Sequence, residues 1–72
     1  MNKIYHCTYD PSDIYTDKIV NANTLIEDYI NTCNEVEDAD TIGWLYTTIE
    51  DNEQEKAIDF IANGWELELM EI

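Results

Sequence analysis

The chain has 72 residues, of which 17 are Asp or Glu and three are Lys or Arg, so its formal net charge at pH 7 is -14. A charge of this sign repels nucleic acid and anionic membrane surfaces, which argues against direct binding to either. Because 44% of the residues are hydrophobic, the acid belongs to a folded domain and not to a disordered tail. We expect one small acidic domain over residues 1–72, whose stability is limited by charge repulsion and rises with salt.

A first strand is predicted for residues 3–9, where Ile, Tyr, Cys and Thr suit a pleated surface. It ends at the turn sequence Asp10-Pro11-Ser12-Asp13. Residues 14–23 fit two structures. Asp13 could cap a short helix, or the chain could be extended, as favoured by the β-branched and aromatic residues Tyr15, Thr16, Ile19 and Val20.

Residues 24–36 carry a clear helical pattern. Thr24 and Glu27 have the spacing of a capping box, and apolar residues recur three and four positions apart at Leu25, Ile26, Tyr29, Ile30, Cys33 and Val36. The predicted amphipathic helix ends in Glu37-Asp38-Ala39-Asp40, where carboxylates would meet the negative end of the helix dipole. Charge placed against local stability suggests a role outside the fold.

Residues 41–49 are predicted to form the central strand because β-branched and aromatic residues dominate this segment. One face of this strand would carry Ile42, Trp44 and Tyr46, and the other would carry Gly43, Leu45, Thr47 and Ile49. Both faces would then be at least half apolar, as expected of a strand inside a sheet.

A second helix is predicted after Asn52, which can cap it, with an apolar face formed by Ala57, Ile58, Phe60 and Ile61. We expect Gly64 to end this helix in a left-handed conformation. Residues 65–72 then alternate as a strand does, with Trp65, Leu67 and Leu69 facing inward and Glu66 and Glu68 facing outward.

The resulting order predicts an α+β domain, a three- to four-stranded sheet with two amphipathic helices packed on one face. The strand at residues 65–72 could pair across a dimer at a sheet edge, whereas Glu66 and Glu68 would discourage such pairing. The sequence leaves the oligomeric state open.

No sequence motif for catalysis or a cofactor is present. His6 is the only histidine, and on a strand the adjacent Cys7 would point to the opposite face. Asp38-x-Asp40 before Gly43 is similar to the start of an EF-hand loop, but Ile42 and Ile49 stand where that loop needs an oxygen ligand and its closing Glu. We predict a protein without enzymatic activity, cofactor or metal.

Two cysteines, Cys7 and Cys33, are expected to be free, partly buried thiols in a reducing compartment. The first residues lack the apolar core of a signal peptide, and no stretch approaches the roughly 20 apolar residues that span a bilayer. These observations predict a cytoplasmic protein with no membrane association.

The acidic residues themselves are the candidate binding site. Carboxylates two apart on a strand lie roughly 6.5–7 Å apart, and those three or four apart on a helix lie about 5–6 Å apart, which is similar to phosphate spacing along a nucleic-acid strand. Three groups have such spacing: Glu66 and Glu68; Glu35, Glu37, Asp38 and Asp40; and Glu50, Asp51, Glu53 and Glu55. The alternative is that these residues form a solvated surface that favours solubility alone.

In size and charge the chain resembles the small acidic proteins with which bacteriophages and plasmids block host defence nucleases, the anti-CRISPR and anti-restriction proteins that mimic DNA. The stretch Phe60-Ile61-Ala62-Asn63-Gly64-Trp65-Glu66 is also similar to the end of a helix in an acidic inhibitor of a CRISPR nuclease. This resemblance implies an inhibitor of a basic, nucleic-acid-binding host protein, a CRISPR effector or a restriction enzyme, in the bacterial cytoplasm. It assigns no functional residue.

Two further hypotheses remain open. An interaction module, antitoxin- or adaptor-like, would bind through an exposed apolar face and would survive high salt. A small enzyme or ligand-binding protein would need a concave site converging on His6. For the inhibitor, Trp44 and Tyr46 are candidate anchors, although packing in the core is the stronger expectation for Trp44.

Overall fold

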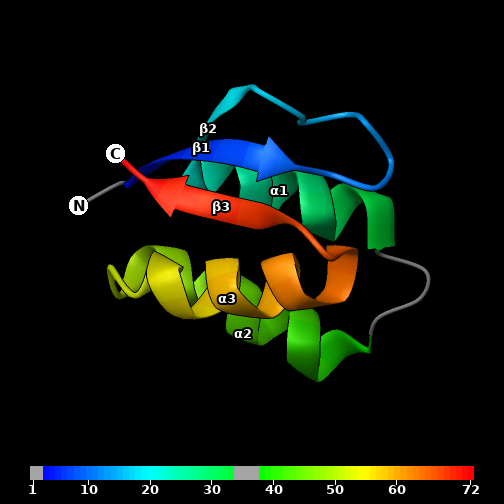
Figure 1. Ribbon diagram of the computed structural model, residues 1–72. Coiled ribbons are helices and arrows are strands. Elements are labelled where there is room, and N and C mark those ends of the chain that lie inside the picture. The colour runs from blue at the N-terminus through cyan, green and yellow to red at the C-terminus, as the bar shows by residue number, and fades with distance from the viewer. Residues whose placement is uncertain (1–2, 34–37) are drawn as a thin grey trace.

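In the computed structural model, which describes residues 3–33 and 38–72, the chain forms a three-stranded antiparallel sheet and three helices (Figure 1). The elements in chain order are β1 (Ile4–Tyr9), β2 (Ile19–Asn21), α1 (Ala22–Cys33), α2 (Ala39–Glu50), α3 (Gln54–Trp65) and β3 (Glu68–Glu71). The predicted α+β class is therefore confirmed. The predicted number of helices is wrong, because the structure has three and not two.

The strand predicted at residues 3–9 is confirmed as β1, and it occupies the centre of the sheet in the order β2-β1-β3. Tyr5 of β1 pairs with Val20 of β2, and Cys7 of β1 pairs with Leu69 of β3. Tyr5, Cys7 and Val20 are buried and Leu69 is half-buried, so this face of the sheet packs on the helices.

The segment 14–23, for which two structures were open, contains no helix before Ala22. It crosses from β1 to the short strand β2, so its end is extended, and α1 follows β2 directly. The helix begins two residues before Thr24, because Asn21 accepts a hydrogen bond from the Thr24 N–H (3.3 Å). The predicted cap at Thr24 is therefore wrong, because the capping residue is Asn21, three residues earlier.

The central strand predicted at residues 41–49 is also wrong, because this segment forms α2. Asp38 starts the helix by accepting a hydrogen bond from the Thr41 N–H (2.7 Å). Leu45 and Thr48 are buried three residues apart on one side, which is a helical spacing and not a strand spacing. The Thr48 hydroxyl donates to the Leu45 carbonyl (2.7 Å) and so needs no partner outside the helix.

The second predicted helix is confirmed as α3, but both of its ends are displaced. Asn52 adopts a left-handed conformation (φ 58°) in the turn before the helix, and Glu53 occupies the capping position without a side-chain capping bond. Gly64 lies inside α3, and the left-handed residue that ends it is Glu66 (φ 58°). The last strand is consequently shorter than predicted, because it begins at Glu68.

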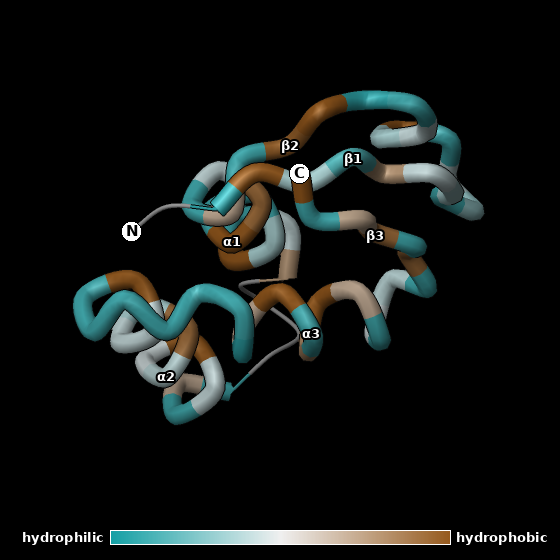
Figure 2. Tube along the Cα trace, turned by 60° about the vertical axis from the view of Figure 1, so that its left-hand side comes forward, coloured by the Kyte–Doolittle hydropathy of each residue, from teal (hydrophilic) through white to brown (hydrophobic). Residues whose placement is uncertain are grey.

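The hydrophobic core lies between the sheet and the helices. Figures 1 and 2 show α1 and α3 next to the sheet and α2 on their far side. Helix α2 packs on both other helices and contributes Leu45, which is fully buried. The core side chains are Tyr5, Cys7, Val20, Ala22, Leu25, Ile26, Tyr29, Ile30, Leu45, Ala57, Ile58, Ile61 and Leu67.

The turn predicted after Tyr9 is organised by the buried carboxylate of Asp10. It accepts hydrogen bonds from the N–H (2.9 Å) and hydroxyl (2.8 Å) of Ser12, and from the N–H groups of Ile14 (3.0 Å) and Tyr15 (2.8 Å). Burial disfavours the charge on Asp10, but these hydrogen bonds outweigh burial and lower its pKa below the ordinary value of 3.8. The ionised carboxylate therefore holds the loop together.

We expect Asp10→Asn to lower the thermal unfolding midpoint at pH 6 by about 5 °C or more, because the new amide presents a donor to N–H groups that need an acceptor. Because the pKa of Asp10 is lowered by folding, its contribution is complete above about pH 4 and disappears as the pH falls through its native pKa. The two proteins should thus converge in stability once the pH lies below the native pKa of Asp10. Asp13→Asn, at an exposed position of the same loop, is the control; an equal loss in this control would contradict the role of Asp10.

Candidate partner-binding surface

The third predicted acidic group is brought together by the tight turn between α2 and α3. Glu50 is the last residue of α2, Asp51 is its C-terminal cap, and Glu53 and Glu55 flank the start of α3. The turn is closed by hydrogen bonds from the N–H groups of Asp51 and Glu53 to carbonyls of α2. We call Glu50, Asp51, Glu53 and Glu55 the acidic turn.

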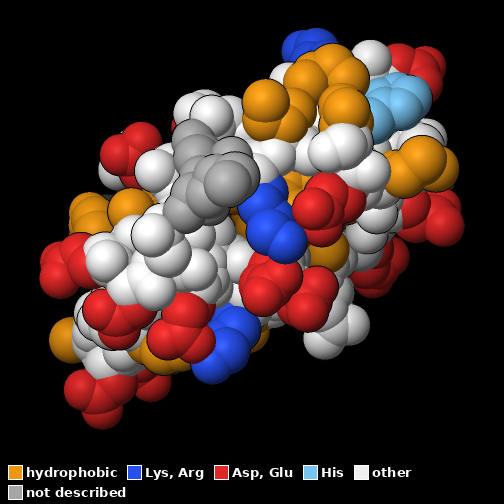
Figure 3. Space-filling view, turned by 90° about the vertical axis from the view of Figure 1, so that its left-hand side faces the viewer, with side chains coloured by type: hydrophobic (Ala, Val, Ile, Leu, Met, Phe, Trp, Pro, Cys, Tyr) orange, Lys and Arg blue, Asp and Glu red, His pale blue; other side chains and the backbone are white. Residues whose placement is uncertain are grey.

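Two lysines partly neutralise this end of the molecule. Lys56 pairs with Glu53, and Lys3 lies between Glu55 (3.1 Å) and Glu71 (3.4 Å). Both lysines donate hydrogen bonds to these carboxylates, which raises the pKa of each lysine; the largest contribution comes from Glu55 for Lys3 and from Glu53 for Lys56. Figure 3 shows Lys side chains on one face of the molecule with Asp and Glu side chains close around them. Glu71 is a member of this surface that sequence reasoning missed, because only the sheet brings the end of the chain next to Lys3.

Glu50 and Asp51 have no basic partner within ion-pair distance among the residues that the structure describes. Both are exposed, and both lie at the C-terminal end of α2, where the helix dipole disfavours a carboxylate. The last turn of α2 contains no basic residue. This pair is therefore the part of the acidic turn that folding explains least.

The second predicted group is only half described, since Glu35 and Glu37 lie outside the described residues. Asp38 and Asp40 lie at the N-terminus of α2, not at the C-terminal end of a helix as predicted. The hydrogen bond from the Thr41 N–H lowers the pKa of Asp38. Asp38 thus has a structural role, and the argument that these two carboxylates oppose local stability is wrong.

The predicted row of Glu66 and Glu68 along one strand is not formed. Glu66 lies before β3 in a left-handed conformation, and Glu68 is the first residue of the strand, opposite Tyr9. Both are exposed. They are near one another along the chain, but they lack the regular spacing that was compared with phosphates.

We expect Glu66→Gly to raise the free energy of unfolding by about 1 kcal/mol relative to Glu66→Gln, because a left-handed backbone is costly for any residue with a Cβ atom. The Gln variant is the matched control, since it removes the same charge and keeps the Cβ atom. Urea unfolding measures the difference. A Gly variant no more stable than the Gln variant would show that the backbone of Glu66 carries no strain.

Aromatic rings form a continuous series from α2 to the loop after β1. Trp44 packs edge-on against Phe60 (5.6 Å between ring centroids), Phe60 against Tyr29 (5.7 Å), Tyr29 against Trp65 (5.0 Å) and Trp65 on Tyr15 (6.1 Å). Trp44 nevertheless stays 39% exposed, so the expectation that it lies in the core is wrong. Together with Tyr46, which is 49% exposed, it is accessible to a partner.

The outer face of the sheet is apolar and uncovered. On this face His6 of β1 pairs with Ile19 of β2 and with Met70 of β3. The large apolar residues around His6 are exposed, namely Ile4, Ile19, Met70 and Ile72, and Figure 3 shows hydrophobic side chains gathered beside the histidine. Alternation in the two strand segments could have indicated this face, but sequence reasoning considered only its inward residues.

His6 and Cys7 lie on opposite faces of β1, as predicted. Cys7 is fully buried, where desolvation raises the pKa of its thiol, and its Sγ lies 3.3 Å from the Tyr9 carbonyl oxygen. His6 Nε2 lies 3.8 Å from a carboxylate oxygen of Asp17. Both cysteines are free, which confirms that part of the prediction. Within residues 3–33 and 38–72, no three His, Cys, Asp or Glu side chains gather as a metal site would require.

Two pockets, of about 300 and about 310 Å³, are both lined by Tyr15, and neither is lined by His6. Comparison with protein-family models, curated proteins and solved structures finds no match. Over the described part of the chain, no helix has the length and apolar character needed to cross a membrane. The surface chemistry of the protein itself must therefore carry the functional argument.

Proposed function

We propose that this protein is a non-enzymatic inhibitor that binds the basic nucleic-acid-binding surface of a bacterial host protein. The first candidate target is a CRISPR effector, which would make the protein an anti-CRISPR DNA mimic, and the second is a restriction enzyme. The observation that carries the proposal is the exposed pair Glu50 and Asp51, held at a helix end where it does not help the fold.

The proposed mechanism is competition for cations. A nucleic-acid groove presents Lys and Arg side chains to phosphates, and the carboxylates of the acidic turn would occupy them instead. Long-range attraction between a chain of net charge -14 and a basic groove would mainly raise the association rate. The rings of Trp44 and Tyr46 are exposed on the helix that leads into the acidic turn. Their contacts with the partner would slow dissociation of the complex.

The proposal is tested with the immobilised protein in a bacterial lysate at about 50 mM and about 500 mM salt, across which electrostatic screening changes strongly. Each captured protein is then purified and its binding is measured against duplex DNA and guide RNA as competitors. We expect a nuclease or effector whose affinity falls with salt and which nucleic acid displaces. A captured partner that is indifferent to both salt and nucleic acid would contradict the inhibitor mechanism.

The uncovered apolar face of the sheet favours a second candidate, an interaction module of the antitoxin or adaptor type. Ile19 and Met70 are each 61% exposed, and Ile72 is 73% exposed. A partner bound here would lose little affinity at high salt, because burial of apolar surface is not screened. Ile19→Ser would lower the affinity for a partner that binds this face and would leave the affinity for a partner of the acidic turn unchanged.

A further inference from the structure

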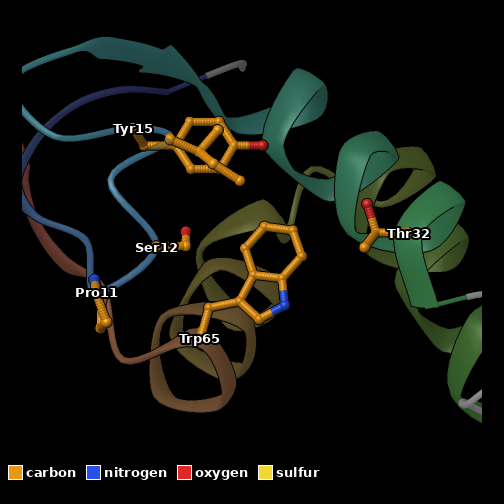
Figure 4. A pocket seen from close by; sticks show the side chains of 6 residues that line it. Pro11, Ser12, Tyr15, Thr32 and Trp65 are labelled. Carbon is orange, nitrogen blue, oxygen red and sulfur yellow. The ribbon is translucent and has the colours of Figure 1, made fainter.

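The pocket of about 300 Å³ lies between the loop after β1 and the C-terminal ends of α1 and α3. Figure 4 shows Ser12, Tyr15 and Trp65 around it, with Thr32 reaching it from α1. Its full lining is Pro11, Ser12, Ile14, Tyr15, Thr32 and Trp65. No ionisable group other than the Tyr15 phenol lines the pocket.

Two aromatic side chains form fixed, flat walls. The rings of Tyr15 and Trp65 stack at 6.1 Å with an angle of 19° between their planes. The Tyr15 hydroxyl donates to a carboxylate oxygen of Asp28 (2.9 Å), and Trp65 packs on the buried ring of Tyr29. Both walls are thus held in place before any ligand arrives, which lowers the entropic cost of binding.

The surroundings of these walls are negatively charged. Asp10 is ionised and only 5% exposed, and the groups that donate to it are neutral and belong to the lining residues Ser12, Ile14 and Tyr15. Asp28 bonds to the hydroxyl of the pocket residue Tyr15. Within the described part of the chain neither carboxylate has a basic partner.

Two helix ends add to this negative potential. Thr32 is the next-to-last residue of α1 and Trp65 is the last residue of α3, so the negative ends of both helix dipoles lie at the pocket. Neither helix has a basic residue in its last turn, and the exposed Glu66 follows Trp65 directly. Of the three lysines, Lys18 lines the neighbouring pocket and none lines this one.

Flat aromatic walls in a negative field suit a planar cation that is weakly hydrated. The guanidinium group of arginine has these properties and stacks on aromatic rings, whereas the ammonium group of lysine is compact and strongly hydrated. We propose that this pocket binds an arginine side chain of the partner. The identity of the partner rests on the proposed function, but the preference for guanidinium belongs to the pocket and can be measured without a partner.

The ligand test uses Trp44→Phe, which leaves Trp65 as the only tryptophan. N-acetyl-arginine methylamide is titrated against Trp65 fluorescence and backbone amide shifts, with the lysine and citrulline analogues as comparisons. We expect saturation in the millimolar range for arginine, at least about threefold weaker binding of lysine, and no saturation with neutral citrulline. Equal responses to all three compounds, or none to arginine, would overturn the proposal.

Thr32→Lys tests the same pocket without altering the core, because Thr32 is exposed. The new ammonium group should abolish saturation by arginine and weaken partner capture about tenfold. Asn31→Lys is the matched control, since it adds the same charge at the adjacent exposed position outside the lining. Saturation by arginine without any basic partner in the lysate would refute the proposed function alone. A nucleic-acid-displaceable partner that Thr32→Lys binds as tightly as Asn31→Lys does would overturn the pocket proposal alone.

Discussion

The double substitution Glu50→Gln and Asp51→Asn is expected to stabilise the fold and to weaken binding to a basic partner at the same time. Both carboxylates lie at the negative end of α2, and neither has a basic partner within residues 3–33 and 38–72. Their removal relieves an unfavourable dipole interaction and part of the repulsion within the acidic turn. We expect the thermal midpoint to rise by about 3–5 °C, and the affinity for the partner to fall about tenfold at low salt.

The matched control is Asp38→Asn with Asp40→Asn, which removes two charges from the opposite end of the same helix. Here the thermal midpoint should fall by a few degrees, because both carboxylates interact favourably with the positive end of α2, whereas an amide oxygen at position 38 can still accept the capping hydrogen bond. Thermal unfolding and partner binding are measured on both double variants. If the Glu50 and Asp51 variant lost stability, or bound the partner as tightly as the unsubstituted protein, the assignment of this pair to partner binding would be wrong.

Leu45→Ala is expected to have the largest effect on stability. The Leu45 side chain is fully buried and is the apolar residue that α2 contributes to the core. Truncation of a buried leucine costs about 2.7–5 kcal/mol, whereas a domain of 72 residues has a total stability of roughly 4–11 kcal/mol. The variant should therefore unfold at much lower urea concentration, and a substantial fraction should be unfolded near 37 °C.

Tyr46→Ala provides the control, because Tyr46 is next in the chain and 49% exposed. Its loss should change stability by less than about 1 kcal/mol. Circular dichroism during urea unfolding distinguishes the two variants. A central strand would bury Tyr46 on one face and Leu45 on the other, so comparable losses in both variants would contradict the helix.

The local patterns of α1 and α3 were readable because each carries an apolar stripe at helical spacing that packs directly on the sheet. The apolar residues of α2 were instead interpreted as the two faces of a strand at residues 41–49. The residues of α2 have strand propensities, and two of its apolar side chains, Trp44 and Tyr46, are exposed. The capping bond of Asp38 and the burial of Leu45 against two other helices outweigh these propensities, and such contacts are invisible to local pattern.

For the acidic groups, too, some properties follow from the local sequence and others depend on residues far away in the chain. Their existence follows from composition, and the acidic turn follows from short spacing along the chain. Whether a carboxylate is neutralised, however, depends on residues far away, as in the case of Glu55 and Glu71 around Lys3. The direction of each helix decides whether a nearby carboxylate is favoured. Because residues 41–49 form part of a helix and not a strand, Asp38 lies at the start of that helix and caps it.

The sequence by itself determined the charge, the α+β class, a first strand at residues 3–9 and the two helices beside the sheet, because these depend on composition and on contacts close in the chain. The central position of that strand in the sheet came only from the tertiary structure. Only the tertiary structure decided the third helix, the uncovered outer face of the sheet and the aromatic pocket between Tyr15, Thr32 and Trp65. These features depend on which distant segments exclude water from one another, and no local pattern contains that information.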